Sequence, residues 1–409
     1  MIRATGPNAA KPTHPPRCSG AVVCWLVALA CASGCASSAP AVPPTIVGTG
    51  QGSVNIAIGK LAVQELSGIA WLGGTRYLAV GDNGANLLWD LDVAIDPASG
   101  RIGAAAATGS VAIGGLAADG EGLVSMPERG TVVVSDEATS AIREFRLSDG
   151  TQVGALPVPA LYLAPNLRSN LGLESLGAHG GMVWTVNEEA LVADGPISTM
   201  TSGAWVRVQR FAADRSPAGQ WAYRVDPISA MNPFTTLERS GVVDVLPIAV
   251  GAALILEREL GGAVVPDFRS RIYYVETGGA TDVSSFASLA GGNFTPLAKT
   301  LLWQGDFALQ NFEGMTLGPR LDDGCRSLLL VSDGNPGGSQ GTTSLVALRI
   351  CGLPACSADM DGSGAVEGGD LAVLLGAWGS PNLTADLDGD GIVAGGDLAM
   401  LLGAWGGCG

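Results

Sequence analysis

Short runs of apolar residues alternate with turn residues through the middle of the chain. One such run, Leu328–Val331, follows a turn at Gly324 and ends just before Asp333. Four or five apolar residues bounded by turn residues are typical of a buried strand. The longest apolar stretch, Val245–Leu256, contains Pro247 and so predicts a strand, a turn and a second strand. This part of the chain is therefore expected to consist of strands and turns, with no long helix.

A sequence pattern recurs at intervals of roughly 50 to 75 residues, and it consists of an opening Ser or Glu, a turn and an apolar run. Five copies begin at Ser67, Glu121, Glu174, Ser240 and Glu313. A repeat of this length built from short strands is typical of a β-propeller. Residues 270–310 have strand-like runs without that opening, so they form either a sixth, degenerate blade or outer strands of the fifth. We expect an all-β propeller over residues 52–350, with six blades favoured.

The segment 357–409 has a different pattern, in which a glycine-rich polar loop followed by an apolar run occurs twice. Apolar residues of both runs recur with the spacing of one face of a helix. They are Leu371, Leu374, Leu375 and Trp378 in the first run and Leu398, Leu401, Leu402 and Trp405 in the second. We expect a small C-terminal α-helical domain in which two short helices pack on each other through these stripes.

Oxygen-bearing residues in both tail loops have the spacing of a calcium-binding loop. The first loop offers Asp359, Asp361, Ser363, the carbonyl of Ala365 and Asp370, and the second offers Asp386, Asp388, Asp390, the carbonyl of Ile392 and Asp397. Calcium needs several hard oxygen ligands on a flexible loop, so one Ca²⁺ is predicted for each copy. Ser363 replaces a carboxylate, and we expect the first loop to bind more weakly unless Glu367 contributes a ligand.

Both loops close with aspartate, and together with the duplication and the leucine-rich helices they resemble a type I dockerin over residues 357–409. The resemblance implies that this dockerin-like tail attaches the chain to a cohesin-like module.

Residues 1–35 have the pattern of an export signal, in which basic residues precede an apolar run from Ala21 to Ala32. The run is too short for an ordinary membrane span. Ala32–Cys35 resembles a bacterial lipoprotein box, which leaves lipidation at Cys35 and plain secretion as alternatives. We therefore expect an exported protein, extracellular or in the cell envelope, with membrane contact only through a lipid anchor at Cys35. Residues 36–51 are expected to form a linker of small residues and proline.

The cysteines lie near the two ends of the chain, and in an exported protein this favours disulfides. Cys325 and Cys351 flank an expected hairpin and are expected to pair with each other. Cys356 would then pair with Cys408 across the tail.

The chain has 38 acidic and 22 basic residues and a formal net charge of −16. Such a surface repels nucleic acid and anionic membranes and favours cations, so no nucleic-acid partner is expected. Lysine occurs only at Lys11, Lys60 and Lys299, so an anion site would depend on arginine or on a bound metal.

Motifs spread over the expected propeller resemble the phytase-like family, described as "esterase-like activity of phytase". They are LSGIAW (66–71), GEGL (120–123), RSNLGLESL (168–176), LILERE (254–259) and NFEGM with LLLVSD (311–333). The resemblance implies a propeller fold and a phosphoric ester hydrolase activity on a phosphorylated small molecule.

Acidic residues recur at the openings and strand ends of the repeats, and equivalent positions of propeller blades face one channel. Carboxylates gathered there would repel one another unless they bound a cation or an arginine. Bound calcium can bridge a phosphate and activate a water, while arginines grip the anionic substrate. The catalytic candidates are Glu121, Glu174, Glu257, Glu313, Arg168 and Arg258, with Asp82, Asp136, Glu137, Glu188, Glu189, Asp333 and Arg143 as further candidates. Alternatively, these residues cap turns and join blades through ion pairs.

Two functions stay open at this point. One is a calcium-dependent phosphoric ester hydrolase attached to an extracellular assembly through its tail, and the other is a non-catalytic propeller that binds a ligand or serves as a scaffold at the cell surface. A Ser-His-Asp triad is not predicted, because His179 lies in an expected turn and should be solvated.

Overall fold

The computed structural model describes residues 42–57, 63, 65–82, 86–116, 119–179, 181–229, 239–249, 251–261, 267–334, 341–353, 358–360, 365–380, 385, 387 and 392–407. The expected export signal, Cys35, Cys356 and Cys408 lie outside these residues. None of the helices in the described part of the chain is long and apolar enough to span a membrane.

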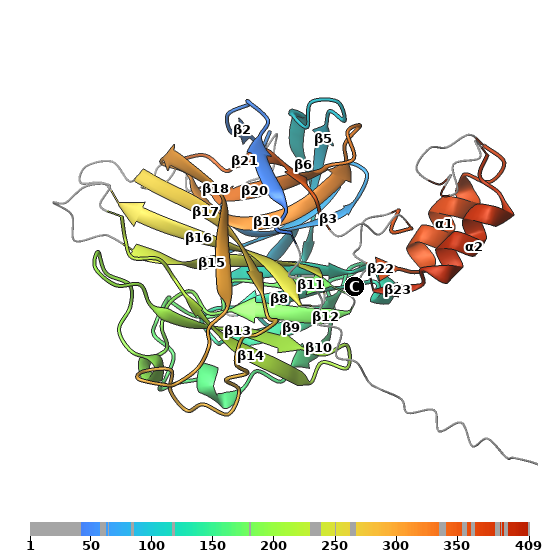
Figure 1. Ribbon diagram of the computed structural model, residues 1–409. Helices are drawn as coiled ribbons and strands as arrows, with labels where there is room; N and C mark the ends of the chain where they lie inside the picture. The colour runs from blue at the N-terminus through green and yellow to red at the C-terminus, as the bar shows by residue number, and fades with distance from the viewer. Residues whose placement is uncertain are drawn as a thin grey trace, which may run out of the picture. The chain divides into compact units, whose positions relative to one another are not determined.

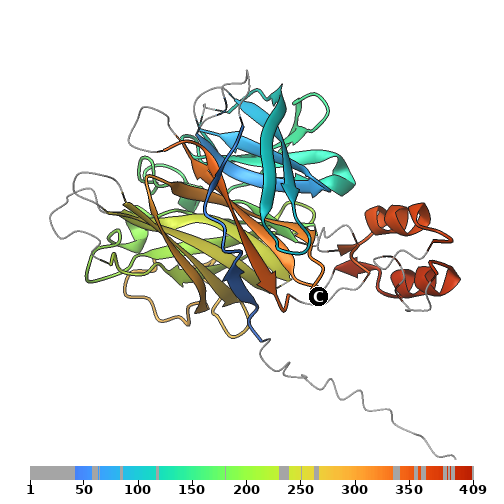
Figure 2. The same cartoon turned by 90° about the horizontal axis from the view of Figure 1, so that it is seen from above.

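Four-stranded antiparallel sheets form the first four blades, and each sheet keeps its strands in chain order from the propeller axis outward (Figures 1 and 2). The strands are β3 (Leu66–Gly73), β4 (Arg76–Gly81), β5 (Leu87–Ile95) and β6 (Ile102–Ala112); β7 (Gly120–Met126), β8 (Thr131–Asp136), β9 (Ala141–Arg146) and β10 (Gln152–Leu156); β11 (Gly177–His179), β12 (Met182–Val186), β13 (Trp205–Phe211) and β14 (Pro217–Arg224); and β15 (Arg239–Ala249), β16 (Ala252–Gly261), β17 (Asp267–Glu276) and β18 (Ala298–Ala308). Short 3-10 helices lie in the connections, at η1 (Pro127–Arg129), η2 (Ala160–Tyr162) and η3 (Val192–Asp194).

The fifth sheet combines the two ends of the propeller sequence. It contains β19 (Asn311–Arg320), β20 (Arg326–Asp333) and β21 (Ser344–Cys351), and both β1 (Thr45–Gly48) and β2 (Val54–Asn55) pair with β21. The N-terminal strands therefore complete the last blade and close the ring. Because β1 falls inside the expected linker 36–51, the propeller begins earlier than the sequence pattern indicated.

The innermost strands contact one another in the cyclic order β3, β7, β11, β15, β19 and back to β3. An apolar cluster fills each of the five spaces between neighbouring sheets. The propeller thus has five blades, and the preference for six was wrong. The strands of residues 270–310 belong to the fourth sheet, because β17 pairs with β16 from Asp267 opposite Gly261 to Glu276 opposite Ala252. No new innermost strand begins there.

Glycines next to the opening residues allow the innermost strands to approach closely. A Cβ added at Gly68 would lie 2.4 Å from the carbonyl oxygen of Glu121 in the next blade. A Cβ added at Gly314 would lie 2.5 Å from the carbonyl oxygen of Ser67, where the fifth blade meets the first. Such distances exclude any side chain, so the recurrent glycine is required by backbone contact between blades.

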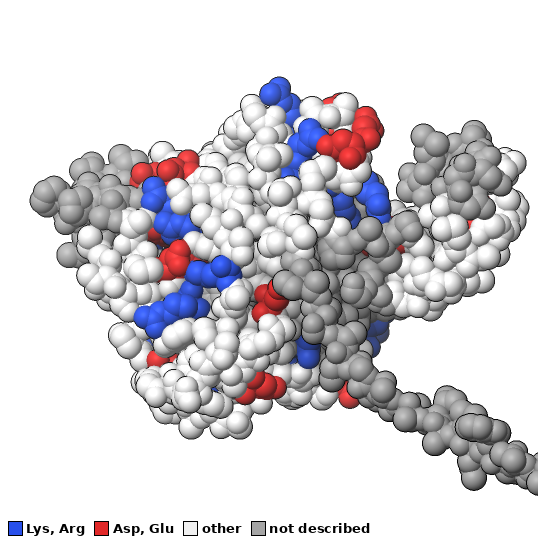
Figure 3. Space-filling model, in the orientation of Figure 1, with Lys and Arg blue, Asp and Glu red and all other residues white. Residues whose placement is uncertain are grey.

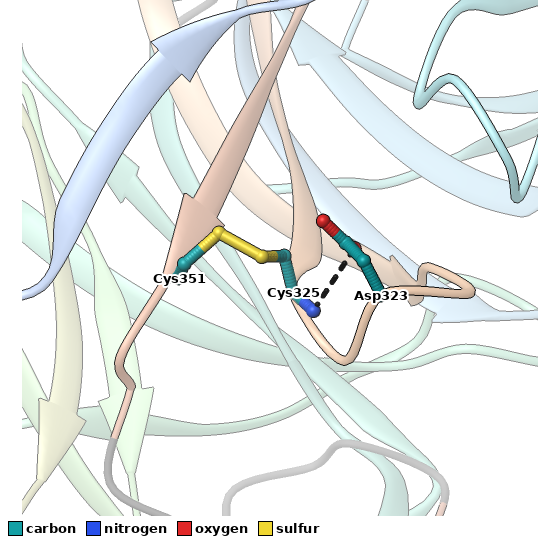
Figure 4. A group of neighbouring side chains, drawn as sticks. All are labelled: Asp323, Cys325 and Cys351. Atoms are coloured by element: carbon teal, nitrogen blue, oxygen red, sulfur yellow. Dashed lines mark hydrogen bonds between the residues drawn. A yellow bond between two sulfur atoms is a disulfide. The ribbon is translucent and has the colours of Figure 1, made fainter.

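A disulfide joins Cys325 to Cys351, as the sequence predicted, and links the start of β20 to the end of β21 (Figure 4). Asp323 lies beside it and accepts a hydrogen bond from the backbone N–H of Cys325. Since both sulfur atoms are in the disulfide, this group is a covalent link between strands and not a metal site.

The tail contains α1 (Gly368–Gly376), α2 (Gly395–Gly403) and the short strands β22 (Ala365–Val366) and β23 (Gly406–Gly407), which pair with each other. Two helices were expected, but only part of each apolar stripe is covered. Leu374 and Leu401 are fully buried, whereas Leu375, Trp378, Leu402 and Trp405 are about half exposed. The stripe is wider than the contact between two short helices can bury.

We predict that Gly68→Ala destabilises the propeller by about 2 kcal/mol or more, because the new methyl group would overlap the backbone of β7. Gly103→Ala in β6 of the same sheet is the matched control, since its Cβ would meet nothing closer than 3.8 Å. Its expected change in the free energy of unfolding is within about 0.5 kcal/mol. Urea denaturation measures both values, and equal stabilities for the two variants would contradict the close-approach argument.

Candidate functional site

The acidic positions of the repeats converge at one end of the propeller axis. In each blade the start of the innermost strand pairs with the end of the second strand, as in Gly120 opposite Asp136 and Asn311 opposite Asp333. The acid that opens a repeat and the acid that ends the following strand therefore lie at the same end of the channel. The five-fold repetition of this arrangement gathers carboxylates from several blades.

Local irregularities in the innermost strands aim these side chains. The register of β7 with β8 shifts between Gly120 and Leu123, where Glu121 lies, and that of β19 with β20 shifts between Phe312 and Gly314, where Glu313 lies. A β-bulge of this kind bends the strand and redirects the bulged side chain.

Seven carboxylates form what we call the axial acidic cluster: Asp82, Asp119, Glu121, Glu137, Glu174, Glu188 and Glu313. Within it, one oxygen each from Asp119, Glu121 and Glu137 lie within 4.8 Å of one another, and so do oxygens of Glu137, Glu174 and Glu188. Glu137 belongs to both triads. The exposed fractions of Glu121, Glu174 and Glu313 are only 6%, 7% and 8%.

Among the described residues, the guanidinium group that pairs with the cluster is that of Arg258 on β16. Its Nη2 lies 3.0 Å from Glu188 Oε1 and 3.2 Å from Glu313 Oε1. Asn311 donates a hydrogen bond of 2.7 Å to the same oxygen of Glu313. Burial works to lower the pKa of Arg258, but Glu188, Glu313 and other nearby carboxylates outweigh it and raise that pKa. Arg258 is therefore held fully charged.

The carboxylates themselves resist ionisation. Burial is the largest cause and raises the pKa of Glu121 and of Glu174 well above the usual range, and their acidic neighbours raise both further. Burial likewise raises the pKa of Glu188 to about 7, although Arg258 works in the opposite direction. The pKa of Asp82 also rises to about 7, through burial and then the charge of Glu313. A single arginine does not compensate this many buried carboxylates.

The donor set fits a hard divalent cation. Clustered carboxylates in a site of low dielectric either keep protons or bind a cation. In the part of the chain that the structure describes, Asn311 Oδ1 and Asp82 Oδ1 are buried and accept no hydrogen bond. Carboxylate and amide oxygens are the ligands that calcium prefers. The residues that can hold calcium are therefore the two triads, with Asp82 and Asn311 beside them.

Several candidates from the sequence lie elsewhere. The side chain of Glu257 lies on the opposite face of β16 from that of Arg258. It accepts hydrogen bonds from Tyr223 and Lys299. Arg168 donates to the carbonyl oxygens of Ala190 and Gly195 and joins two loops.

Some of the further candidates form structural contacts, which is the alternative that the sequence left open. Arg143 pairs with Asp136 at 2.8 Å, at the end of β8. Glu189 accepts hydrogen bonds from the backbone N–H groups of Ala190 and Ser198. These residues cap turns, as the second interpretation of the sequence proposed.

Asp119 was missed by sequence reasoning and His179 was misjudged. Asp119 directly precedes β7 in a connection between blades, and only its position beside the Gly120–Glu121 opening could have indicated its role. His179 ends β11 and is 4% exposed, so the expectation of a solvated turn histidine was wrong. It is buried because β11 runs along the inside of the ring.

Both tail loops keep a buried aspartate at their closing position. Asp370 accepts hydrogen bonds from the N–H groups of Met360 and Glu367, and Asp397 accepts the equivalent bonds from Leu387 and Ala394. Both carboxylates are fully buried, and residues 357–409 contain no Lys, Arg or His. A carboxylate offers about four acceptor positions, so each can bind a cation while keeping these bonds.

The other tail candidates divide into two groups. Asp359 is buried, Ala365 begins β22, and Ile392 is partly exposed. Asp361, Ser363, Asp386, Asp388 and Asp390 lie outside the described residues.

The described residues on the face drawn in Figure 3 do not form a large basic patch. Basic and acidic side chains are interspersed there in small groups, and most of that face is uncharged. The concentrated charge of the described propeller residues lies at the axis.

A family model described as "Phytase-like: Esterase-like activity of phytase" matches residues 61–336. No curated protein sequence matches the chain. Among solved structures, a luciferin-regenerating enzyme is similar with a TM-score of 0.34 and 14% identity over 74% of this chain and 96% of its own. A glucose dehydrogenase is similar with a TM-score of 0.35 and 10% identity over 75% of this chain and 99% of its own.

We predict that stability without added metal falls as pH rises from about 4 towards 7. Asp82 and Glu188 bind protons more tightly in the folded chain than in the unfolded chain, so unfolding releases protons in this range. Because their pKa values in the folded chain are about 7, the loss from these two groups continues through pH 7 and ends only when both are ionised in the folded chain as well.

Asp82→Asn should reduce that loss of stability by on the order of 1 kcal/mol, measured by urea denaturation in chelator at pH 4.5 and 7.5. Asp149→Asn is the control, because Asp149 is exposed and its pKa is lowered by hydrogen bonds from Thr151. If the stability of wild type and of Asp82→Asn depended equally on pH, burial and charge repulsion at Asp82 would not affect the stability of the folded chain.

Proposed function

The chain belongs to the phytase-like family, and on that premise we propose that it is a calcium-dependent phosphoric ester hydrolase. The observation that carries the proposal is the pair of carboxylate triads that share Glu137 at the end of the propeller axis. Among the described residues, this cluster unites high negative charge, burial and one fixed arginine. We assign the phosphorylated substrate to this cluster.

Calcium held by the triads would offset the repulsion between carboxylates and substrate phosphate, and would lower the pKa of a bound water. The chain's own residues then perform two tasks. Arg258 presents a charged donor for a phosphate oxygen, with its position fixed by Glu188 and Glu313. Glu188, whose pKa is about 7 before a cation binds, would become an ionised ligand when calcium occupies its triad, and it holds Arg258 in place.

A non-catalytic ligand-binding propeller is the second candidate. It is favoured by the engagement of Arg143 and Arg168 in structural contacts, which leaves Arg258 as the one arginine of the three at the cluster. In that case cations bound in the axial acidic cluster would stabilise the ring of blades and would not take part in catalysis.

For the tail we propose two calcium ions and attachment to a cohesin-like module, following the dockerin-like repeat of the sequence. The exposed apolar pairs Leu375 with Trp378 and Leu402 with Trp405 supply matched surfaces for such a partner. We also propose export, with secretion and lipidation of Cys35 as alternatives, because the Cys325–Cys351 disulfide suits an oxidising compartment.

We predict that the chain hydrolyses an aryl phosphate or phytate with calcium and loses this activity in chelator. Glu174→Gln and Glu313→Gln should each lower kcat at least a hundredfold, because each removes charge from the axial cluster. Glu276→Gln is the control, since Glu276 at the end of β17 bonds only to Tyr274 among the contacts described. Circular dichroism checks that each variant folds. Calcium binding without hydrolysis of any tested ester would favour the ligand-binding candidate.

We predict that the tail contributes two calcium sites, one per copy. In calorimetric titrations of the full chain, Asp370→Asn and Asp397→Asn should each remove about one equivalent of bound calcium, since each replaces a buried closing carboxylate. The two variants control for each other, and Glu276→Gln in the propeller should leave the total unchanged. Unaltered stoichiometry in both tail variants would contradict the assignment.

A further inference from the structure

A cavity of about 500 Å³ lies at the end of the propeller axis opposite the axial acidic cluster. Its wall includes the far ends of the innermost strands, reaching Gly73 on β3, Ser125 on β7, His179 on β11, Ile248 on β15 and Arg320 on β19. The acidic cluster lies at the beginnings of the same strands. The two sites therefore share a scaffold and lie at opposite ends of it.

The inner wall of the cavity is apolar and is built by all five blades. Each blade contributes at least one large apolar residue, and these include Ile69, Leu123, Leu176, Leu246 and Met315. All but Leu246 are buried. This volume is within the range of about 300–1,000 Å³ that is usual for small-molecule sites, and such sites are mostly apolar with a few polar groups.

The charged side chains of the cavity are mainly basic. Arg76, Arg320 and Arg326 line it, together with His179, and Asp359 is the acidic side chain among the described lining residues. Arg76 also pairs with Asp90 at 3.3 Å, and Arg320 donates a hydrogen bond to the carbonyl oxygen of Asp359. Arg326 lies 5.1 Å from the ring centre of Trp71, and its Nε and Nη2 both donate to the carbonyl oxygen of Gly318. In a chain with a net charge of −16, this is an unusual concentration of arginine.

We infer that this cavity binds a small amphipathic anion, with its apolar body against the five-blade wall and its carboxylate or sulfonate among the arginines. Burial of the apolar body supplies most of the affinity, at roughly 25 cal/mol per Å² of apolar surface. The guanidinium groups select an anionic head group by charge-assisted hydrogen bonds. The inference does not depend on the proposed hydrolase activity.

The test is displacement of anilinonaphthalene sulfonate from the full chain, followed by its fluorescence. Decanoate should displace the dye at least tenfold more effectively than decyltrimethylammonium, a cation with the same alkyl chain. Ala178→Trp fills the cavity from β11 and should abolish displaceable binding, and Arg320→Gln should weaken decanoate about tenfold. Arg320 is exposed, so that variant is expected to fold.

Two control variants separate the cavity from other surfaces. Arg146→Gln removes an exposed arginine that pairs with Asp149, and Trp378→Ala removes an exposed tail aromatic that could bind dye. Both should leave decanoate displacement unchanged. Equal displacement by the anion and the cation, or wild-type affinity in Ala178→Trp, would overturn the inference. So would the absence of dye and decanoate binding in folded wild-type chain.

Discussion

The close approach of the innermost strands around one axis is the constraint on which the rest of the propeller depends. Gly68, Gly122 and Gly314 lie where the backbone of a neighbouring blade leaves no room for a Cβ. Strands that approach this closely bring the residue beside each glycine to the centre of the ring. At Gly122 and Gly314 the glycine allows the backbone contact, and the glutamate before it, Glu121 or Glu313, lies in the axial acidic cluster.

This geometry places negative charge where water is scarce. Glu121 and Glu174 would each be solvated in an isolated strand, but the closed ring removes that solvent and brings their carboxylates together. Arg258 offsets part of the repulsion by pairing with Glu188 and Glu313. A site with this residual charge has a strong preference for cations, and the proposed calcium chemistry follows from that preference.

The same strands carry a different environment at their other ends. Alternation along a strand and the taper of the ring place apolar residues such as Leu123 and Met315 around a cavity, with arginines beyond them. One end of the axis therefore favours cations, and the other has the composition of a site for an apolar molecule with an anionic group. The two sites lie at opposite ends of the innermost strands, so the length of these strands keeps them apart.

The sequence by itself determined the all-β class, the five repeat openings, the Cys325–Cys351 pair and two short tail helices. These features depend on local patterns, namely apolar runs between turns, residues that flank a hairpin and helical spacing of leucines. The number of blades was decided by the tertiary structure, because a strand after residue 270 can start a new sheet or extend the old one, and pairing with β16 settles which. The membership of the acidic cluster was also decided there. Glu257 and Arg258 are adjacent in sequence, but strand alternation sends Arg258 to the axis and Glu257 to Lys299 on the other face.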